Sequence, residues 1–156
     1  MTIRLTALAI VFAASTSFAQ TTAAPTRQTS PAAGAASVPA ALKPYQGTWV
    51  LTTPDGQPLA QNGDLTIAIT GDKYAQSVAG VVNERGSIKL DATKKPTWID
   101  LTITEGADAG KIQVGLIEIA DGVMKGVLGA AGSTTRPAGL AAAPGMISFI
   151  GKKKPA

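Results

Sequence analysis

The sequence predicts an all-β domain of about eight short antiparallel strands, arranged as a small barrel or a sandwich. From residue 42 onward, short runs rich in Val, Ile and Thr alternate with clusters of Gly, Asp, Asn and Pro. No long apolar stripe with a period of 3.6 residues interrupts them, so helices are not expected. A closed barrel is favoured because it leaves no exposed strand edges, which matters in a chain that has no cysteine and cannot form disulfides.

Eight segments have the composition and length of strands, and turn residues separate them. The expected strands are Gly47–Thr53, Leu65–Thr70, Lys73–Val81, Gly86–Leu90, Thr97–Glu105, Ile112–Ala120, Val123–Leu128 and Met146–Lys152. The expected turns are Asp55-Gly56, Asn62-Gly63-Asp64, Gly71-Asp72, Asn83-Glu84 and Asp121-Gly122, and the last is the strongest hairpin signal. The Gly-rich stretch 126–145 lacks the Gly-Lys-Ser/Thr and the helix of a phosphate loop, so we expect a long, mobile connection that is either a lid or has no specific role.

Alternation of apolar and polar residues assigns the faces of these strands. Ile99, Leu101 and Ile103 share one face, opposite Trp98 and Asp100, which predicts one buried face and one polar face. A second strand of this kind has Leu65, Ile67 and Ile69 on its apolar face. Within Ile112–Ile119 the apolar phase shifts next to Gly115, which indicates either a bulge or a strand that lies between two environments.

The N-terminal segment of the chain predicts export. Arg4, an apolar run over residues 5–14 and the small residues Ser17 and Ala19 have the pattern of a signal peptide, so we expect residues 1–19 to be removed. Residues 20–41 form an Ala/Thr/Pro-rich spacer with too little apolar bulk to fold, residues 42–152 form the domain, and residues 153–156 form a basic tail. We expect a periplasmic or extracellular protein without a stable membrane anchor.

The composition excludes several kinds of functional site. The chain has no cysteine and no histidine, which rules out Cys or His zinc sites, Ser-His-Asp triads and thiol nucleophiles. Without Arg4 the net charge is +3, from 13 Lys and Arg against 10 Asp and Glu, and no basic stripe with interleaved aromatic residues indicates nucleic-acid binding. We expect no cofactor and no metal. The terminal lysines Lys152, Lys153 and Lys154 are interpreted as a solvated tail, with weak attraction to anionic membranes as the alternative.

The order of the short motifs resembles that of a known family. The motifs are Tyr45-Gln46-Gly47-Thr48-Trp49, Asp55-Gly56, Gly71-Asp72-Lys73, Gly86-Ser87-Ile88-Lys89-Leu90-Asp91, Pro96-Thr97-Trp98-Ile99-Asp100-Leu101, Glu105-Gly106, Gly110-Lys111, Gly115-Leu116-Ile117-Glu118 and Arg136-Pro137. Together they resemble an uncharacterised secreted lipocalin-like domain family that is frequent in planctomycete bacteria. The resemblance covers residues 42–152 and implies an up-and-down lipocalin-like β-barrel, but it implies no specific activity.

Within that resemblance, Gly47-x-Trp49 is similar to the opening motif of lipocalins, whose Trp closes the barrel floor beneath a cation. Lys152 or Arg136 is the expected cation here, and a core Trp without a partner is the alternative. Asp100 is either a solvent-exposed polar residue, a structural residue paired with Arg136 or with backbone amides near residues 91–95, or a catalytic or ligand-binding group. The structural role is preferred, because Asp100 lacks the partner residues that catalysis requires.

The leading hypothesis is a non-enzymatic module that binds a small apolar or amphipathic ligand inside the barrel. The candidate lining residues are Trp49, Trp98, Ile99, Leu101 and Ile117. The alternative is a structural or protein-interaction domain with a filled core. An enzyme that uses Asp100 and Glu118 is the weakest hypothesis. Glu105 and Glu118 are the only other acids in the expected strands, and no glycosidase-like acid pair with aromatic platforms is recognisable.

Overall fold

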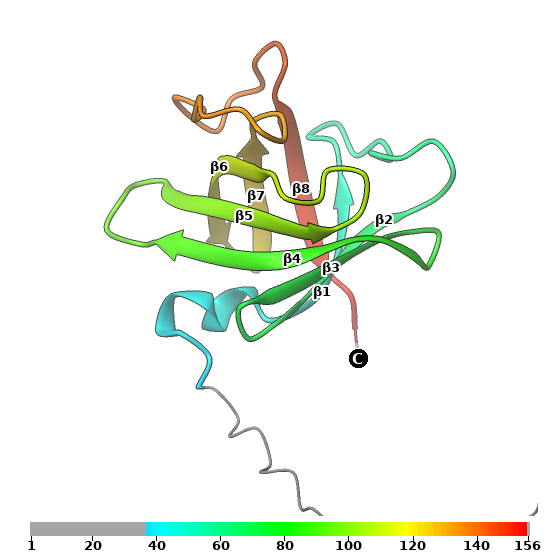
Figure 1. Cartoon of the computed structure of the whole chain (residues 1–156), viewed down its shortest axis with the longest axis horizontal. Helices are drawn as coiled ribbons and strands as arrows, with labels where there is room; N and C mark the ends of the chain where they lie inside the picture. Colours follow the sequence, from blue (N-terminus) through cyan, green and yellow to red (C-terminus); the bar gives the residue numbers. More distant parts are fainter. Residues whose placement is uncertain (1–36, 156) are drawn as a thin grey trace, which may run out of the picture. The chain divides into compact units, whose positions relative to one another are not determined.

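The computed structural model describes residues 37–155 and forms a closed barrel of eight antiparallel strands (Figure 1). A short 3₁₀ helix, η1 (Ala40–Tyr45), precedes the strands. The strands are β1 (Gly47–Thr52), β2 (Leu65–Thr70), β3 (Lys73–Val78), β4 (Val81–Asp91), β5 (Thr97–Glu105), β6 (Ile112–Ala120), β7 (Val123–Leu128) and β8 (Ile147–Lys153). Each strand pairs with the next along the chain, and β8 pairs with β1 to close the sheet. The up-and-down barrel is therefore confirmed.

Most strand boundaries agree with the sequence prediction, and one turn does not. The β3–β4 hairpin turns at Ala79-Gly80, where both residues have positive φ, and not at Asn83-Glu84. Two positive φ angles in a two-residue loop fit the type I′ turn that matches strand twist. The predicted turn residues instead lie inside β4, and Glu84 pairs with Gln76 of β3. The Asp121-Gly122 hairpin is confirmed, again with both φ angles positive.

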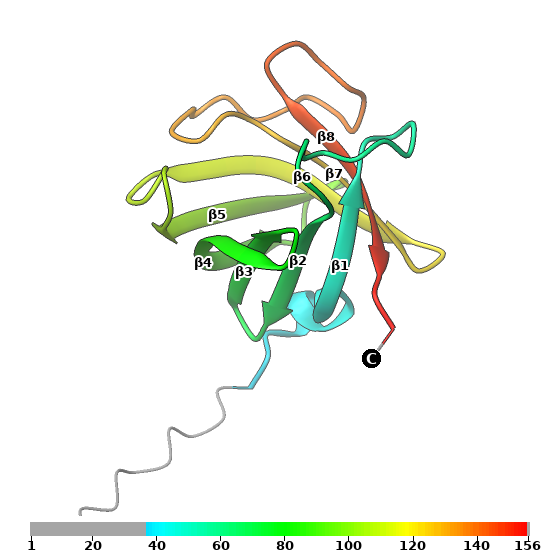
Figure 2. The same cartoon turned by 90° about the vertical axis from the view of Figure 1, so that its right-hand side faces the viewer.

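The up-and-down topology gives the barrel two different ends. The β1–β2, β3–β4, β5–β6 and β7–β8 connections lie at one end, which we call the open end. Helix η1 and the three other hairpins lie at the other, which we call the closed end; Figures 1 and 2 show η1 beneath the strands there.

The predicted bounds of the spacer and of the basic tail each differ from the structure at the edge of the domain. Residues 40 and 41 belong to η1, and Lys153 belongs to β8. The predicted signal peptide, and residues 20–36 of the spacer, lie outside the described residues.

The closed half of the barrel holds the core. The residues that alternation assigned to a buried face of β5, Ile99, Leu101 and Ile103, are buried as expected. Ile99 and Leu101 pack with apolar residues from the other strands and from η1, which are Leu42, Tyr45, Trp49, Leu51, Ile69, Tyr74, Ile88, Ile117, Met124 and Phe149. Burial of this apolar set is the main stabilising contribution to the fold.

Helix η1 is fastened to the closed end by specific hydrogen bonds. The Trp49 indole Nε1–H donates to the carbonyl of Tyr45 at 2.8 Å. The Gln46 amide donates to the carbonyl of Gly71 at 2.9 Å and accepts from the Gly71 N–H at 2.7 Å, which joins η1 to the β2–β3 turn. Trp49 is only 2% exposed and closes the floor, as the resemblance implied. The cation over its ring is Lys153, with Nζ 5.6 Å from the ring centroid, and not Lys152 or Arg136.

A second apolar layer lies on the outer wall of the barrel. The pairing register places Leu116 of β6 and Val127 of β7 opposite each other on the outer face, yet they are 2% and 0% exposed. The covering segment is the β7–β8 connection, residues 129–146, which we call the strap. Its Gly129 and Gly132 N–H groups donate to the carbonyls of Val114 and Ile112 at 2.9 and 2.8 Å, and Pro137 is buried.

This outer layer explains the shifted apolar phase of β6. The pairing of β6 with β5 and β7 is continuous, so the bulge proposed next to Gly115 is absent. The strand instead lies between two apolar environments, the barrel interior at Ile117 and the strap at Leu116. A long, mobile connection was expected here. The first half of the strap differs from that expectation, because two backbone hydrogen bonds attach it to β6.

Candidate functional site

The candidate site is a cavity at the open end of the barrel. Its volume is about 800 Å³, within the range of pockets that hold small organic ligands. The lining residues come from β1 to β4, from β6 to β8 and from the loops at the open end. They are Leu51, Thr53, Leu59, Leu65, Gln76, Asn83, Glu84, Ala107, Asp108, Gln113, Leu128, Ala130, Ala131, Met146, Ile147, Ser148 and Phe149.

One wall of the cavity is apolar. Four neighbouring strands of the closed sheet contribute it, in the order β2, β1, β8 and β7. Their side chains are, in the same order, Leu65, Leu51, Phe149 and Leu128. The Phe149 ring lies against Gly126, where a Cβ atom would come within 2.3 Å of Cζ. Glycine at this position therefore lets the ring lie against the wall, so that cavity volume is left beside it.

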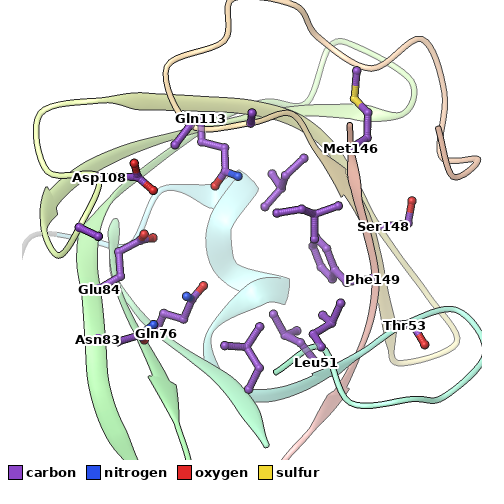
Figure 3. A pocket seen from close by; sticks show the side chains of 17 residues that line it. Leu51, Thr53, Gln76, Asn83, Glu84, Asp108, Gln113, Met146, Ser148 and Phe149 are labelled. Carbon is purple, nitrogen blue, oxygen red and sulfur yellow. The ribbon is translucent and has the colours of Figure 1, made fainter. Parts of the chain in front are cut away.

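The opposite wall is polar, and Figure 3 shows its side chains projecting into the cavity. Gln76 on β3 and Glu84 on β4 are cross-strand partners, and Gln113 is contributed by β6. One of the two Gln113 amide N–H groups donates to the carbonyl of Gly129 at 2.7 Å, which leaves the carbonyl oxygen and the second N–H for other partners. Asp108 lies at the rim and is paired with Lys111, Nζ to Oδ1, at 2.7 Å.

Glu84 is linked to the core through Tyr74. The buried Tyr74 hydroxyl donates to Glu84 Oε1 at 2.8 Å. Burial raises the pKa of Tyr74, and the hydrogen bond to Glu84 and the Glu84 charge raise the pKa further. Tyr74 is therefore a neutral donor at any physiological pH, and it fixes one oxygen of Glu84 while the carboxylate faces the cavity.

The residues of this cavity differ from those that the sequence pattern predicted. Trp98 was expected to line the interior, but it lies on the outer wall, is 40% exposed and stacks against Arg136, so its assignment as a lining residue is wrong. Trp49, Ile99, Leu101 and Ile117 do face the interior, but they belong to the packed closed half and do not line the cavity. Glu84 was missed because it was assigned to a turn. The available signal was Ala79-Gly80, which permits an earlier turn.

Arg136 binds the outer wall through both terminal nitrogens and the face of its guanidinium, as a structural residue would. It is paired with Asp100, which confirms the expected partner. Its Nη1 also donates to the carbonyls of Ile99 at 3.0 Å and Gly115 at 2.6 Å. The guanidinium carbon lies 4.4 Å from the centroid of the Trp98 ring, and Lys94 Nζ lies 5.1 Å from the same centroid. Arg136 thereby holds the strap against β5 and β6.

The acids named for an enzymatic site do not meet in the cavity. Asp100 and Glu118 face outward on β5 and β6, and Glu105 is exposed and paired with Arg85 at 3.3 Å. In the part of the chain that the structure describes, no group of three acidic residues could hold a metal ion.

Within residues 37–155, no helix has the length and apolar character required to cross a bilayer. Comparison of the chain with protein-family models, curated proteins and solved structures found no match in any of the three.

Proposed function

We propose that this chain is an exported, non-enzymatic, lipocalin-like domain that binds a small amphipathic molecule at the open end of its barrel. The observation that carries the proposal is the cavity of about 800 Å³, walled by apolar side chains on one side and polar side chains on the other. Such a division suits a ligand with an apolar body and a polar group. Export is supported by the signal-peptide pattern of residues 1–19.

The rim of the cavity supports the same function. Val81, Ile112 and Ile147 stand at the starts of β4, β6 and β8, where the chain enters the barrel wall from the open end. All three are strongly exposed, at 71%, 50% and 47%. Ile147 also lines the cavity, so its exposed side chain provides a first contact surface for an apolar ligand.

A structural or protein-interaction domain with a filled core is the competing function. The closed half of the interior is filled, as that hypothesis expects, but the open half contains the cavity. An enzyme that uses Asp100 and Glu118 has weaker support, because both side chains face away from the cavity.

The test is ligand-dependent stabilisation combined with a blocked cavity. A ligand that binds only the folded state at 100 times its Kd should stabilise it by about 2.7 kcal/mol, which is visible as a rise in Tm. Straight-chain ten-carbon amphiphiles with different head groups serve as probes. Leu128→Trp fills the cavity and should raise the Kd at least tenfold. Ile150→Trp, on the outer face of the next strand, is the matched control and should leave the Kd unchanged. No Tm shift with any probe would reject the proposed function.

A further inference from the structure

Resting on the proposed function, we infer that the cavity selects amphiphiles with a positively charged amine head group, and that Glu84 is the residue that recognises it. The cavity wall has two carboxylates, Glu84 and Asp108, and no lysine or arginine among its seventeen described lining residues. An anionic head group such as a fatty-acid carboxylate would therefore meet negative charge and no cationic side chain among the lining residues.

The two carboxylates differ in what already neutralises them. Asp108 is paired with Lys111 at the rim, so its charge is balanced within the protein. No ion pair among residues 37–155 joins Glu84 to a cation, and its hydrogen bond is received from the neutral Tyr74 hydroxyl. Glu84 is thus the uncompensated charge of the cavity wall, and a partly buried carboxylate gains most from a cationic partner.

The surrounding polar groups also fit a donor-rich head group. Gln113 uses one of its two N–H groups on the carbonyl of Gly129, which holds the amide in place, and its carbonyl oxygen remains an acceptor. Glu84 presents its second carboxylate oxygen, while Tyr74 occupies the first. Gln76, the cross-strand partner of Glu84, lies beside it. An ammonium group has three N–H donors and no acceptor, so it can donate to the Glu84 carboxylate and to the amide oxygens of Gln76 and Gln113.

The position of Glu84 also fits an amphiphile. Glu84 is on β4, whereas Leu51, Phe149 and Leu128 lie on β1, β8 and β7, across the closed barrel from β4. An ammonium group at Glu84 therefore leaves the attached hydrocarbon body facing the apolar wall. The recognised class is a primary or secondary amine on an apolar chain or ring.

Three probes with one tail separate this inference from the proposed function. Decylammonium, decanol and decanoate each have ten carbons and differ in the head group, which at pH 7 is cationic, neutral and anionic respectively. Titration calorimetry on the purified protein should give a Kd for decylammonium at least tenfold lower than for decanol, with decanoate the weakest. Equal affinity for all three keeps the binding function and overturns the amine selectivity. No binding of any probe rejects the binding function itself.

Glu84→Gln tests the assigned residue, because its carbonyl oxygen can still accept the Tyr74 hydroxyl. It should abolish the preference for decylammonium over decanol and leave the Kd of decanol within about twofold. Glu105→Gln is the matched control, since it removes the same charge from an exposed outer-wall pair with Arg85. Loss of selectivity in Glu105→Gln as well would show a long-range charge effect and overturn the assignment to Glu84. If Glu84→Gln fails to fold, the comparison of the three probes on the unsubstituted protein still decides the selectivity.

Discussion

The two halves of the barrel interior are built from the same strands but packed differently. In the closed half, Trp49, Ile99 and Ile117 are almost fully buried and η1 covers the floor. In the open half, the inward positions of the same or neighbouring strands carry Gln76, Glu84 and Gln113, which border the cavity. An eight-stranded barrel has an interior just wide enough to be filled by side chains or to hold one small ligand. In this barrel, side chains fill the interior at the closed end, and the open end has space for a small ligand.

The difference shows that stability and binding are placed in separate regions. The closed half contains the apolar contacts and the hydrogen bonds that fasten η1, so substitutions there should change the free energy of unfolding. The open half exposes polar side chains to solvent, so substitutions there should change binding with little effect on stability. Substitutions at matched positions test this division.

The largest effect is expected for Trp49→Ala at the closed end. This substitution removes the floor of the core, the hydrogen bond to the Tyr45 carbonyl and the contact with Lys153. We expect a loss of about 3–5 kcal/mol in the free energy of unfolding, measured by urea denaturation. Trp98→Ala on the outer wall is the control and should cost about 1–2 kcal/mol, because that ring is 40% exposed. An equal cost for the two would contradict the assignment of the core to the closed half.

An intermediate effect is expected for Arg136→Lys, which tests how the strap is held. A lysine keeps the charge but cannot bond Asp100 and two carbonyls together while stacking on Trp98. We expect a loss of about 1–2 kcal/mol and faster amide hydrogen exchange at Gly129 and Gly132. Arg85→Lys, in the exposed pair with Glu105, should cost less than about 0.5 kcal/mol.

The substitution Asp100→Asn separates the contribution of the ion pair with Arg136 from that of the other Arg136 contacts. The Asp100 side chain is 38% exposed, so solvent screens its ion pair, and we expect this substitution to cost less than Arg136→Lys. If Asp100→Asn is the more damaging of the two, the carboxylate and not the set of backbone contacts holds the strap.

Sequence alternation was sufficient for most of the fold, because each buried face leaves a two-residue pattern. Ile99, Leu101 and Ile103 are buried as predicted, and β5 to β7 begin and end at the predicted residues. The β6 sequence also indicated the outer apolar layer, because the apolar residue Leu116 is at a position that faces outward. The covering segment could not be read from the sequence, because the strap has the Ala- and Gly-rich composition of an ordinary loop.

The site was less predictable, for two physical reasons. Asn83 and Glu84 have the side chains of turn residues, whereas the true turn begins with Ala79, which rarely adopts positive φ. That one misplaced turn removed Glu84 from the strands. The cation over Trp49 depends on the register of β8, and in a run of three lysines the sequence does not show whether Lys152 or Lys153 faces inward.

The smallest effect on stability is expected for Gln76→Leu in the open half. No hydrogen bond from the Gln76 side chain to another described residue is formed, and the residue borders the solvent-accessible cavity. Replacing it with an apolar residue of similar size should therefore change the free energy of unfolding by less than about 0.5 kcal/mol. The affinity for decanol should rise, since the wall becomes more apolar. A stabilisation above about 2 kcal/mol in urea denaturation would mean that leucine here is packed as tightly as in a core. The open half would then behave like the closed half, and the separation of binding from stability would fail.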